Sequence, residues 1–471
     1  MSAKRERREL GSTESLCPVC LEVLPARRIA EGEDVRLEKT CPHHGRFSTI
    51  IWRGPPSYDA WAHPGDELPA RSRSPGAGKG CPFECGLCRD HRQQTCCVVL
   101  EVTDGCDLRC RFCFAAAGTR GRDPDLGAIE RRYRALISAG GPCNIQLSGG
   151  EPTLRDDLPA IVALGRSTGH QFIQLNTNGL RISRDPRYLR ALKEAGLGCV
   201  FLQFDGTTDA AHEHIRGAAL ARTKAAAIEN CAEAGVGVVL APTVVPGVND
   251  DQLGAIVAFA LERAPVVRGV HFQPVSFFGR YPRRPGDRDR ITIPEVMRAL
   301  ERQTDGAIRV SHLRPATSEN AHCSFHGNFI LRPDGTLGPF PAAEGSKCCP
   351  GKDAGGKPVP RASCCGERSA GAKRAREFVA RHWAFPDAPR PGREAAPEDS
   401  LDAFLRDVGE RSFCVSGMAF QDVWNIDLGR VRDCHLHVAS LASGDQRIVP
   451  FCAYNLTDAA GKSLHRRGAT T

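Results

Sequence analysis

Short apolar runs alternate with amphipathic stretches between residues 96 and 305. The apolar runs are rich in β-branched residues and end in polar or glycine residues, which indicates strands. The amphipathic stretches have helical spacing, and several finish in Ala-Gly, where glycine suits a left-handed helix stop. We predict strands over 97–103, 144–150, 172–179, 199–206, 236–245 and 267–276, and helices over 126–140, 158–169, 187–196, 223–235 and 251–264.

Six βα units in succession indicate an α/β fold with a parallel sheet and right-handed crossovers, either closed into a barrel or open and doubly wound. In both architectures the functional residues gather at the C-terminal ends of the strands. The unusual polar residues of this chain fall at those ends. A Cys-, Pro- and Gly-rich segment precedes this core, and a mixed extension follows it.

Cysteine is the residue that composition singles out, with 22 in a chain of 471 residues. The N-terminal MSAKRERREL lacks the apolar stretch of a signal peptide, so we expect a reducing compartment and a cytoplasmic protein. Cysteines in such a chain are metal ligands or catalysts more often than crosslinks. The sequence contains no run of about 18 apolar residues, so we predict no membrane span. The 63 Lys and Arg exceed the 55 Asp and Glu, but they are scattered, so no nucleic-acid partner is indicated.

Three cysteines, Cys106, Cys110 and Cys113, follow the first predicted strand at spacings of four and three. From spacing alone they could bind zinc, be buried structural cysteines or hold an iron–sulfur cluster. Structural zinc sites are usually closed by a fourth ligand. Three thiolates on one loop better suit a [4Fe–4S] cluster with one iron left open. The strand before the loop, Phe114 after it and the strand end SGGEPT at 148–153 favour the cluster.

This combination resembles the radical S-adenosylmethionine (SAM) enzymes. Their motifs Cys-x3-Cys-x2-Cys and Gly-Gly-Glu-Pro are matched here by the three cysteines and by Gly149, Gly150, Glu151 and Pro152. The resemblance implies a partial (β/α)6 barrel and a cluster whose open iron chelates the amino and carboxylate groups of SAM. An electron would then split the sulfonium into methionine and a 5′-deoxyadenosyl radical, which can take hydrogen from an unactivated carbon.

The resemblance also implies roles for residues at the other strand ends. Glu151 and the strand-end backbone would receive the methionyl ammonium. Asn176 and Asn178 would bond the ribose or carboxylate, although Asn178-Gly179 equally fits a plain turn. Arg216 would pair with the SAM carboxylate, unless it is a solvated helix arginine. The full set that we expect around SAM is Phe114, Gly149, Gly150, Glu151, Asn176, Asn178, Gln203, Asp205, Arg216 and Thr243.

A second thiol-rich segment, at 80–97, lies just before the core. Four of its cysteines can close an auxiliary [4Fe–4S] cluster: Cys81, Cys85, Cys88 and Cys96. Cys96 is preferred to Cys97 because Cys97 begins a strand. A zinc site fits the same spacing and stays an alternative.

The N-terminal CPVC at 17–20, followed by CPHHG at 41–45, resembles a zinc or rubredoxin-like knuckle. Its expected ligands are Cys17, Cys20, Cys41 and either His44 or His43. We expect a structural metal here, Zn or mononuclear Fe, because a short loop-rich segment cannot otherwise stabilise itself.

Three cysteines of the extension, Cys414, Cys434 and Cys452, are far apart in sequence but each has apolar or aromatic neighbours, which can mean mere burial. With the knuckle and the segment GCPFECGLCRDH, the ending FCAYN resembles the radical SAM group that includes tetraether lipid synthase and the methanopterin-pathway pterin methyltransferase. This resemblance covers nearly the whole chain. It implies a third cluster on these thiols, with Cys323 as fourth ligand, although AHCSFHGNF at 321–329 lacks an expected second cysteine.

We therefore predict a zinc or rubredoxin-like knuckle at 1–60, an auxiliary-cluster segment at 61–95, the radical SAM core at 96–305 and an extension at 306–471. Within the extension, a stretch poor in large apolar residues predicts a mobile insertion at about 344–398. The pairs Cys348-Cys349 and Cys364-Cys365 lie in it and have no place in the family pattern; they are redox-active, metal-scavenging or simply tolerated.

The expected reaction is C–C bond formation or methylation at an unactivated carbon of a lipid or pterin-like substrate. It would use SAM, its [4Fe–4S] cluster and one or two auxiliary clusters. A peptide-modifying enzyme is an alternative. We expect an electron donor such as ferredoxin or flavodoxin, and peripheral membrane contact if the substrate is a lipid. A non-catalytic zinc-rich scaffold and a SAM-independent electron-transfer protein are the alternatives from other classes.

Overall fold

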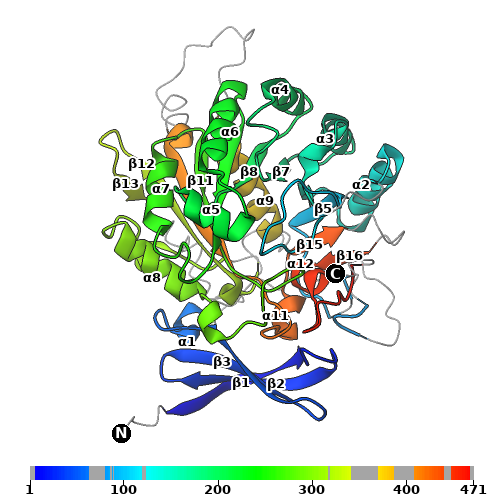
Figure 1. Ribbon diagram of the computed structural model, residues 1–471, viewed down its shortest axis with the longest axis vertical. Helices are drawn as coiled ribbons and strands as arrows, with labels where there is room; N and C mark the ends of the chain where they lie inside the picture. Colours follow the sequence, from blue (N-terminus) through cyan, green and yellow to red (C-terminus); the bar gives the residue numbers. More distant parts are fainter. Residues whose placement is uncertain are drawn as a thin grey trace, which may run out of the picture.

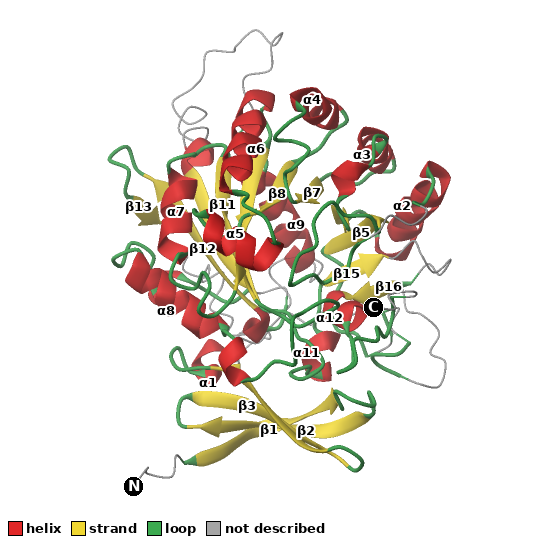
Figure 2. Cartoon of the chain, in the orientation of Figure 1, coloured by secondary structure: helices red, strands yellow, loops and turns green. Residues whose placement is uncertain are grey.

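The computed structural model shows a barrel-like mixed sheet with helices around its outside and a small antiparallel sheet packed against one end (Figure 1). Figure 2 shows the strands of the large sheet at the centre and the helices at its periphery. The structure describes residues 6–62, 80–84, 87–88, 90–118, 123–316, 319–340, 370–386, 408–439 and 447–466.

Six parallel strands form the centre of the large sheet, in the order β5, β6, β7, β8, β9, β11. Their bounds are β5 Cys97–Thr103, β6 Asn144–Gly149, β7 Ile173–Thr177, β8 Cys199–Gln203, β9 Gly237–Ala241 and β11 Val267–Pro274, and the short β10 Thr243–Val244 pairs with β11. Helices occupy the crossovers: α2 Leu126–Gly140, α3 Leu158–Ser167, α4 Pro186–Glu194, α5 Asp209–Arg216, α6 Ala221–Ala234 and α7 Leu253–Leu261. This arrangement confirms the partial (β/α)6 barrel.

Side chains alternate between the two faces of these strands, because successive residues of a strand point to opposite sides. The outward residues are aliphatic and fully buried beneath the helices, as Ile145 and Leu147 of β6 show. The intervening residues line the interior of the barrel, and many are polar, as Gln146 and Ser148 show. The apolar core therefore lies outside the strands, and the interior is left for a site.

The C-terminal extension adds strands to both edges of the barrel sheet. At one edge β14 Ser412–Met418 pairs in parallel with β11, and β12 Ser324–Leu331 and β13 Leu337–Pro339 follow antiparallel. At the other edge β15 Leu436–Ala439 pairs in parallel with β5, and β16 Ile448–Pro450 follows. The extension is thus part of the barrel wall, which its sequence alone does not indicate because these partners are distant along the chain.

Further helices of the described residues are α1 Tyr58–Trp61, α8 Ile293–Gln303, α9 Ala370–Trp383, α11 Leu428–Arg432 and α12 Phe451–Asn455. None of the helices that the structure describes combines the length and apolar character that crossing a bilayer requires.

Helix α9 Ala370–Trp383 lies at the N-terminal ends of the barrel strands, inside the range 344–398 that the sequence predicts as mobile. The ring of Trp383 stacks on Phe201 of β8 with centroids 5.8 Å apart. Phe378 and Trp383 close the floor of the barrel interior. Phe378 and Trp383 are half-buried there, and the mobility of the insertion stays a prediction. The four vicinal cysteines of the insertion lie outside the described residues.

Strands β1 Arg7–Leu16, β2 Val23–Glu31, β3 Asp34–Cys41 and β4 Gly45–Trp52 form the small antiparallel sheet. It packs on the segment that follows β14. Thr13 Oγ1 and Arg28 Nε donate to the Asp427 carboxylate at 2.7 and 2.8 Å, and Lys39 Nζ donates to the Val423 carbonyl at 3.0 Å. These bonds join the N-terminal cysteine segment to the C-terminal extension.

Candidate active site

A cavity of about 620 Å³ runs through the barrel interior from the thiol loop after β5 to helix α9. This volume lies in the range of small-molecule sites. Cys106, Cys110 and Cys113 all line it. So do nine of the ten residues that the resemblance places around SAM; Asp205 is the exception. Residues from every barrel strand therefore meet around one space.

The thiol loop is fixed at both ends by backbone hydrogen bonds. The Cys106 N–H donates to the Gly118 carbonyl at 3.1 Å, and Cys113 and Arg280 exchange two bonds of 3.0 Å. Burial raises the pKa of Cys106 to about 12, and the other two thiols contribute to the rise. Burial also raises the pKa of Cys110, and a bound cationic group would favour the thiolate form of both residues.

The loop fits a [4Fe–4S] cluster better than a single ion. Thiolates are the protein ligands of such clusters, and this loop supplies three. Two sulfur ligands of one tetrahedral zinc lie about 3.8 Å apart, given Zn–S bonds of about 2.3 Å. The sulfur atoms of Cys106, Cys110 and Cys113 do not all lie within 4.8 Å of one another. A single tetrahedral zinc ion could therefore not bind all three sulfur atoms in this arrangement.

Two glycines allow the end of β6 to approach the thiol loop. A Cβ atom on Gly149 would lie 2.2 Å from the carbonyl oxygen of Thr103, and one on Gly150 would lie 2.0 Å from that of Gly105. Gly149 also has a φ of +117°, which favours glycine. The N–H of Gly150 donates to Thr103 and that of Glu151 to Gly105, both at 2.7 Å. Any larger residue would push the strand end away from the loop.

The carboxylate of Glu151 is buried and accepts four hydrogen bonds. The donors are the N–H and hydroxyl of Thr153 at 3.1 and 2.6 Å, the hydroxyl of Thr177 at 2.7 Å and the N–H of Asn178 at 2.7 Å. Burial raises the pKa of Glu151, and these donors oppose the rise. The side chain therefore holds the ends of β6 and β7 together, and the contact with the methionyl ammonium that the resemblance implies stays a prediction.

Arg216 reaches the cavity from the end of α5 and is held by a buried acid. Its Nε and Nη2 donate to the two carboxylate oxygens of Asp205 at 2.6 and 2.8 Å, and Nη2 also donates to Thr243 Oγ1 at 2.9 Å. Arg216 is 5% exposed and Asp205 is fully buried. Burial alone would raise the pKa of Asp205, but the guanidinium lowers it. Arg216 is thus a fixed cation beside Cys110, not a solvated helix residue.

The Asn178 side chain joins the end of β7 to the thiol loop. Its Oδ1 accepts from the Leu180 N–H at 2.9 Å, as a turn residue does. Its Nδ2 donates to Asp107 of the thiol loop at 2.6 Å. The turn and the site therefore coexist at this residue. Asn176 and Gln203 line the cavity at β7 and β8.

Phe114 connects the thiol loop with the C-terminal extension. Its ring makes edge contacts with Phe278, Phe420 and Phe451, with centroids 5.2, 5.6 and 5.7 Å away. Such edge-to-face pairs are favourable beyond the area that they bury. The extension thereby contributes an aromatic wall next to the loop.

The cysteines of the second predicted cluster are only partly described. Cys85 lies outside the described residues. Cys81 packs with the apolar residues around Cys452. The carbonyl of Cys88 accepts a hydrogen bond from the His91 N–H at 3.0 Å. Cys96 is buried at the start of β5, and burial raises its pKa to about 12. Among the described residues, Cys96 does not belong to the apolar cluster that contains Cys81.

For the third predicted cluster, the structure groups Cys323, Cys434 and Cys452. Burial raises the pKa of Cys434, and the neighbouring Cys452 and Cys323 raise it further. Arg430 Nη2 donates to Cys323 Sγ at 3.2 Å. Cys414 does not belong to this group: it lies on the inner face of β14, where its neighbours are Ser416 and Trp383. Because β14 is a barrel strand, Cys414 faces the central cavity.

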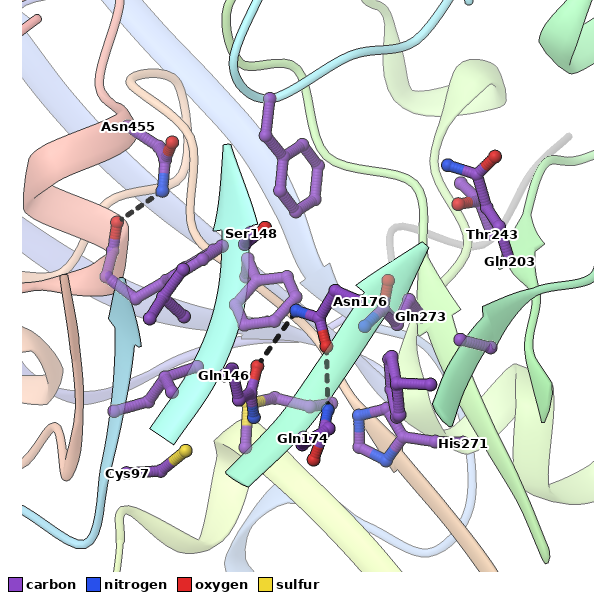
Figure 3. Close-up of a pocket in the computed structure, with 18 of the residues that line it drawn as sticks. Cys97, Gln146, Ser148, Gln174, Asn176, Gln203, Thr243, His271, Gln273 and Asn455 are labelled. Carbon is purple, nitrogen blue, oxygen red and sulfur yellow. Dashed lines mark hydrogen bonds between the residues drawn. The ribbon is translucent and has the colours of Figure 1, made fainter. Parts of the chain in front are cut away.

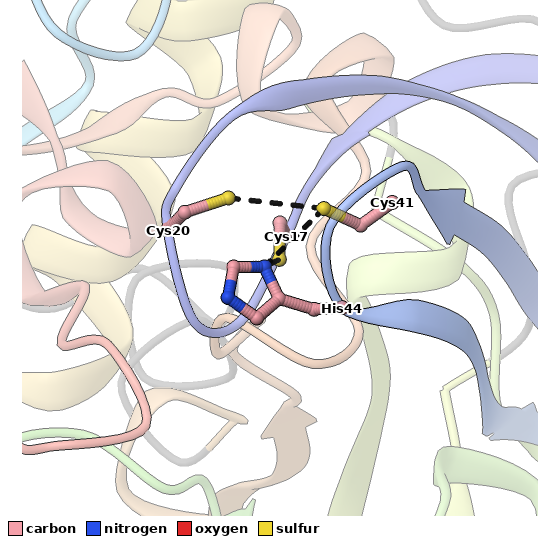
Figure 4. Close-up of side chains that lie close together, drawn as sticks. All are labelled: Cys17, Cys20, Cys41 and His44. Atoms are coloured by element: carbon pink, nitrogen blue, oxygen red, sulfur yellow. Dashed lines mark hydrogen bonds between the residues drawn. The ribbon is translucent and has the colours of Figure 1, made fainter.

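The N-terminal knuckle has the geometry of a zinc site (Figure 4). Cys17, Cys20, Cys41 and His44 place one ligand atom each within 4.8 Å of one another. Cys20 Sγ and Cys41 Sγ are 3.8 Å apart, and His44 Nδ1 is 3.6 and 3.4 Å from Cys17 Sγ and Cys41 Sγ. Tetrahedral zinc needs about 3.8 Å between sulfurs and about 3.5 Å between sulfur and nitrogen. The structure selects His44 over His43.

Sequence reasoning missed several residues that line the cavity: Gln146, Ser148, Gln174, His271 and Gln273 (Figure 3). A signal for them exists in the strands. Parallel strands covered on both faces are usually apolar throughout. Here polar residues recur at every second position, in NIQLS, IQLNT and HFQ. This alternation indicates that the inner face of the strands is polar and could bind a ligand.

Two family profiles match the chain: the radical SAM superfamily over residues 100–260 and the HMPTM N-terminal zinc ribbon domain over residues 9–53. The chain is 33% identical to the 7,8-dihydro-6-hydroxymethylpterin dimethyltransferase of Methanocaldococcus jannaschii, over 97% of this chain and 94% of that protein. It is 29% identical to the GTP 3′,8-cyclase of Alkaliphilus oremlandii, over 38% of this chain and 56% of that protein.

Among solved structures, SuiB of Streptococcus suis bound to SAM is similar with a TM-score of 0.36 and 18% identity, over 45% of this chain and 47% of that chain. The relationship to the dimethyltransferase extends from the knuckle through the barrel to the extension. The chain is a radical SAM enzyme and belongs to the family of that dimethyltransferase.

Proposed function

We propose that this enzyme methylates a carbon atom of a pterin-like heterocycle. Support comes from the similarity, over nearly the whole length, to a dimethyltransferase of 7,8-dihydro-6-hydroxymethylpterin. The observation that carries the proposal is the cavity itself. It joins the thiol loop to a wall of amide side chains, and such a wall suits a polar ring better than an acyl chain.

In this proposal Cys106, Cys110 and Cys113 hold the [4Fe–4S] cluster, which supplies one electron to SAM when bound. Arg216 pairs with the SAM carboxylate, and Asp205 and Thr243 keep its guanidinium in place. The glycines of the β6 end allow the backbone to lie against the bound nucleoside. The barrel walls exclude water and foreign hydrogen donors from the reacting carbon.

The proposed reaction is balanced as follows. One electron splits SAM into methionine and the 5′-deoxyadenosyl radical. A C–H hydrogen of the substrate moves to that radical, which gives 5′-deoxyadenosine and a substrate radical. A methylated one-carbon donor transfers its methyl group as a cation equivalent and leaves in its demethylated form, and a second electron completes the C–CH₃ bond. Both electrons come from an external one-electron donor of the ferredoxin or flavodoxin class.

Three further metal sites belong to the proposal. The knuckle on Cys17, Cys20, Cys41 and His44 binds zinc and stabilises the small sheet. An auxiliary cluster is held by Cys434 and Cys452 with Cys323, and the segment around Cys81 contributes the ligands of another.

The test is product analysis with the anaerobically reconstituted enzyme, SAM, a strong reductant and 7,8-dihydro-6-hydroxymethylpterin, in cell extract that supplies one-carbon donors. We expect 5′-deoxyadenosine and a pterin that carries an added methyl group, as detected by mass spectrometry. Deuterium placed on the methylated carbon should appear in 5′-deoxyadenosine. Formation of 5′-deoxyadenosine without any change in the pterin would contradict the proposed substrate.

A further inference from the structure

Five amide side chains line one side of the cavity, and we refer to them as the amide wall: Gln146, Gln174, Asn176, Gln203 and Gln273 (Figure 3). They come from the inner faces of β6, β7, β8 and β11. Every amide offers both a hydrogen-bond donor and an acceptor. The wall can therefore match a ligand edge on which donors and acceptors alternate.

Part of the amide wall is oriented by hydrogen bonds within it. Gln174 Nε2 donates to Asn176 Oδ1 at 2.7 Å, and Asn176 Nδ2 donates to Gln146 Oε1 at 3.2 Å. Gln174 is 2% exposed although it is polar. Because each amide fixes the next, their remaining donor and acceptor positions are set before a ligand arrives. Such preorganisation lowers the cost of binding.

The rest of the amide wall has unused hydrogen-bonding capacity. The Oε1 atom of Gln203 is buried and accepts no hydrogen bond from the residues that the structure describes. Asn328 of β12 also lines the cavity, and its buried Oδ1 atom likewise accepts no hydrogen bond from the described residues. Buried polar atoms without partners are rare in folded proteins and need an explanation. A ligand that donates hydrogen bonds in the cavity provides one.

Aromatic side chains border the same part of the cavity. Phe201 and Trp383 stack with ring centroids 5.8 Å apart and planes 26° apart, and His271 lies 5.6 Å from Phe201. His271 Nδ1 is 2.9 Å from Ser416 Oγ, which fixes its ring. Flat faces next to a polar edge are the features that a flat, polar ring requires.

We propose that the amide wall, together with Phe201 and Trp383, is the subsite that selects the substrate. It takes a fused nitrogen heterocycle with an amino group, a ring N–H and a carbonyl on one edge. Gln146, Gln174 and Gln273 form hydrogen bonds with that edge, and the aromatic rings contact the face of the heterocycle. The inference rests on the proposed function and adds which residues set the substrate class. An acyl chain would leave the amides unpaired on binding and is excluded by this subsite.

The test measures binding of 7,8-dihydro-6-hydroxymethylpterin to the reconstituted holoenzyme with SAM present, by isothermal titration calorimetry. Gln174→Leu and Gln273→Leu each remove an amide while keeping the size of the side chain. We expect each to raise the dissociation constant about tenfold, which is the loss of one or two hydrogen bonds from a buried site. Gln171→Leu is the matched control, because it makes the same change at an exposed position just before β7. Its dissociation constant should stay within about twofold of the wild-type value.

Thermal unfolding separates a loss of contact from a loss of fold. Gln273 makes no side-chain hydrogen bond to any residue in the described ranges, so Gln273→Leu should leave the unfolding midpoint unchanged while binding weakens. Unchanged pterin binding in both cavity variants would overturn the inference and leave the proposed function standing. A wild-type holoenzyme that cleaves SAM but binds no dihydropterin would instead refute the proposed substrate class.

Discussion

The buried pair of Asp205 and Arg216 allows a quantitative test of the candidate site. Asp205→Asn keeps the shape of the side chain and removes its charge. The carboxylate accepts from Arg216 at 2.6 and 2.8 Å and from the Thr243 N–H at 3.0 Å, with both charged groups almost wholly removed from solvent. In the variant the guanidinium stays buried, next to an amide that can turn only one oxygen toward it.

The size of the effect follows from burial. Removing one partner of a buried ion pair costs about 3–5 kcal/mol because the other charge is left uncompensated. A loss of about 3 kcal/mol raises the unfolded population by more than about a hundredfold. The matched control is Glu130→Gln, which breaks an exposed pair on α2 whose side chains are 69% and 39% accessible. That pair contributes only about 0.3–0.5 kcal/mol.

The assay is urea denaturation under anaerobic conditions, followed by tryptophan fluorescence, for the wild type and both variants. We expect a large fall in unfolding free energy for Asp205→Asn and almost none for Glu130→Gln. The affinity for SAM should fall in parallel for Asp205→Asn, because Arg216 loses its fixed position. Equal unfolding free energies for the two variants would refute the argument that Asp205 compensates a buried cation.

Three other predictions concern the loop, the knuckle and pH. Gly150→Ala should lose iron from the thiol loop, since its Cβ would lie 2.0 Å from a backbone oxygen, whereas Gly140→Ala, with open space, should keep it in iron assays. Cys41→Ser should lose bound zinc and speed hydrogen exchange in β1–β4, as mass spectrometry can follow. Burial lowers the pKa of Lys224 to about 8 in the folded protein, whereas a lysine in the unfolded chain has a pKa of about 10.4. Between these two pKa values the unfolded chain therefore binds more protons than the folded protein. Stability should therefore rise with pH in that window, and Lys224→Met should lose the rise in paired urea titrations.

Local pattern was sufficient to predict the centre of the fold. The strands and crossover helices show a change from β-branched runs to helical spacing, and the loop cysteines lie where a parallel sheet gathers its chemistry. The pairing of β14 with β11 and of β15 with β5 was not predictable in this way. Neither partner is near in sequence, and nothing in a short strand specifies a distant parallel neighbour. Figure 1 shows β15 beside β5.

The same limit explains the differences at the site. Cys414, Cys434 and Cys452 share similar apolar surroundings in sequence, but only the structure shows that Cys414 faces the cavity from a barrel strand. The sequence motif predicts that Glu151 binds SAM. Its hydrogen bonds with Thr177 and Asn178 could not be predicted, because those residues lie at the end of the next strand. The three cysteines of the knuckle were predictable because they are close in sequence, but the choice of His44 over His43 needed the structure.

The central claim is that the loop of Cys106, Cys110 and Cys113 holds a cluster that cleaves SAM. The most direct measurement is the yield of 5′-deoxyadenosine when anaerobically reconstituted, reduced protein is incubated with SAM. We expect clear formation by the wild type and none by the variant in which all three cysteines are alanine, with zinc retained in the knuckle of both. Absence of 5′-deoxyadenosine from an iron-loaded, reduced wild type, or an equal yield from the variant, would contradict it.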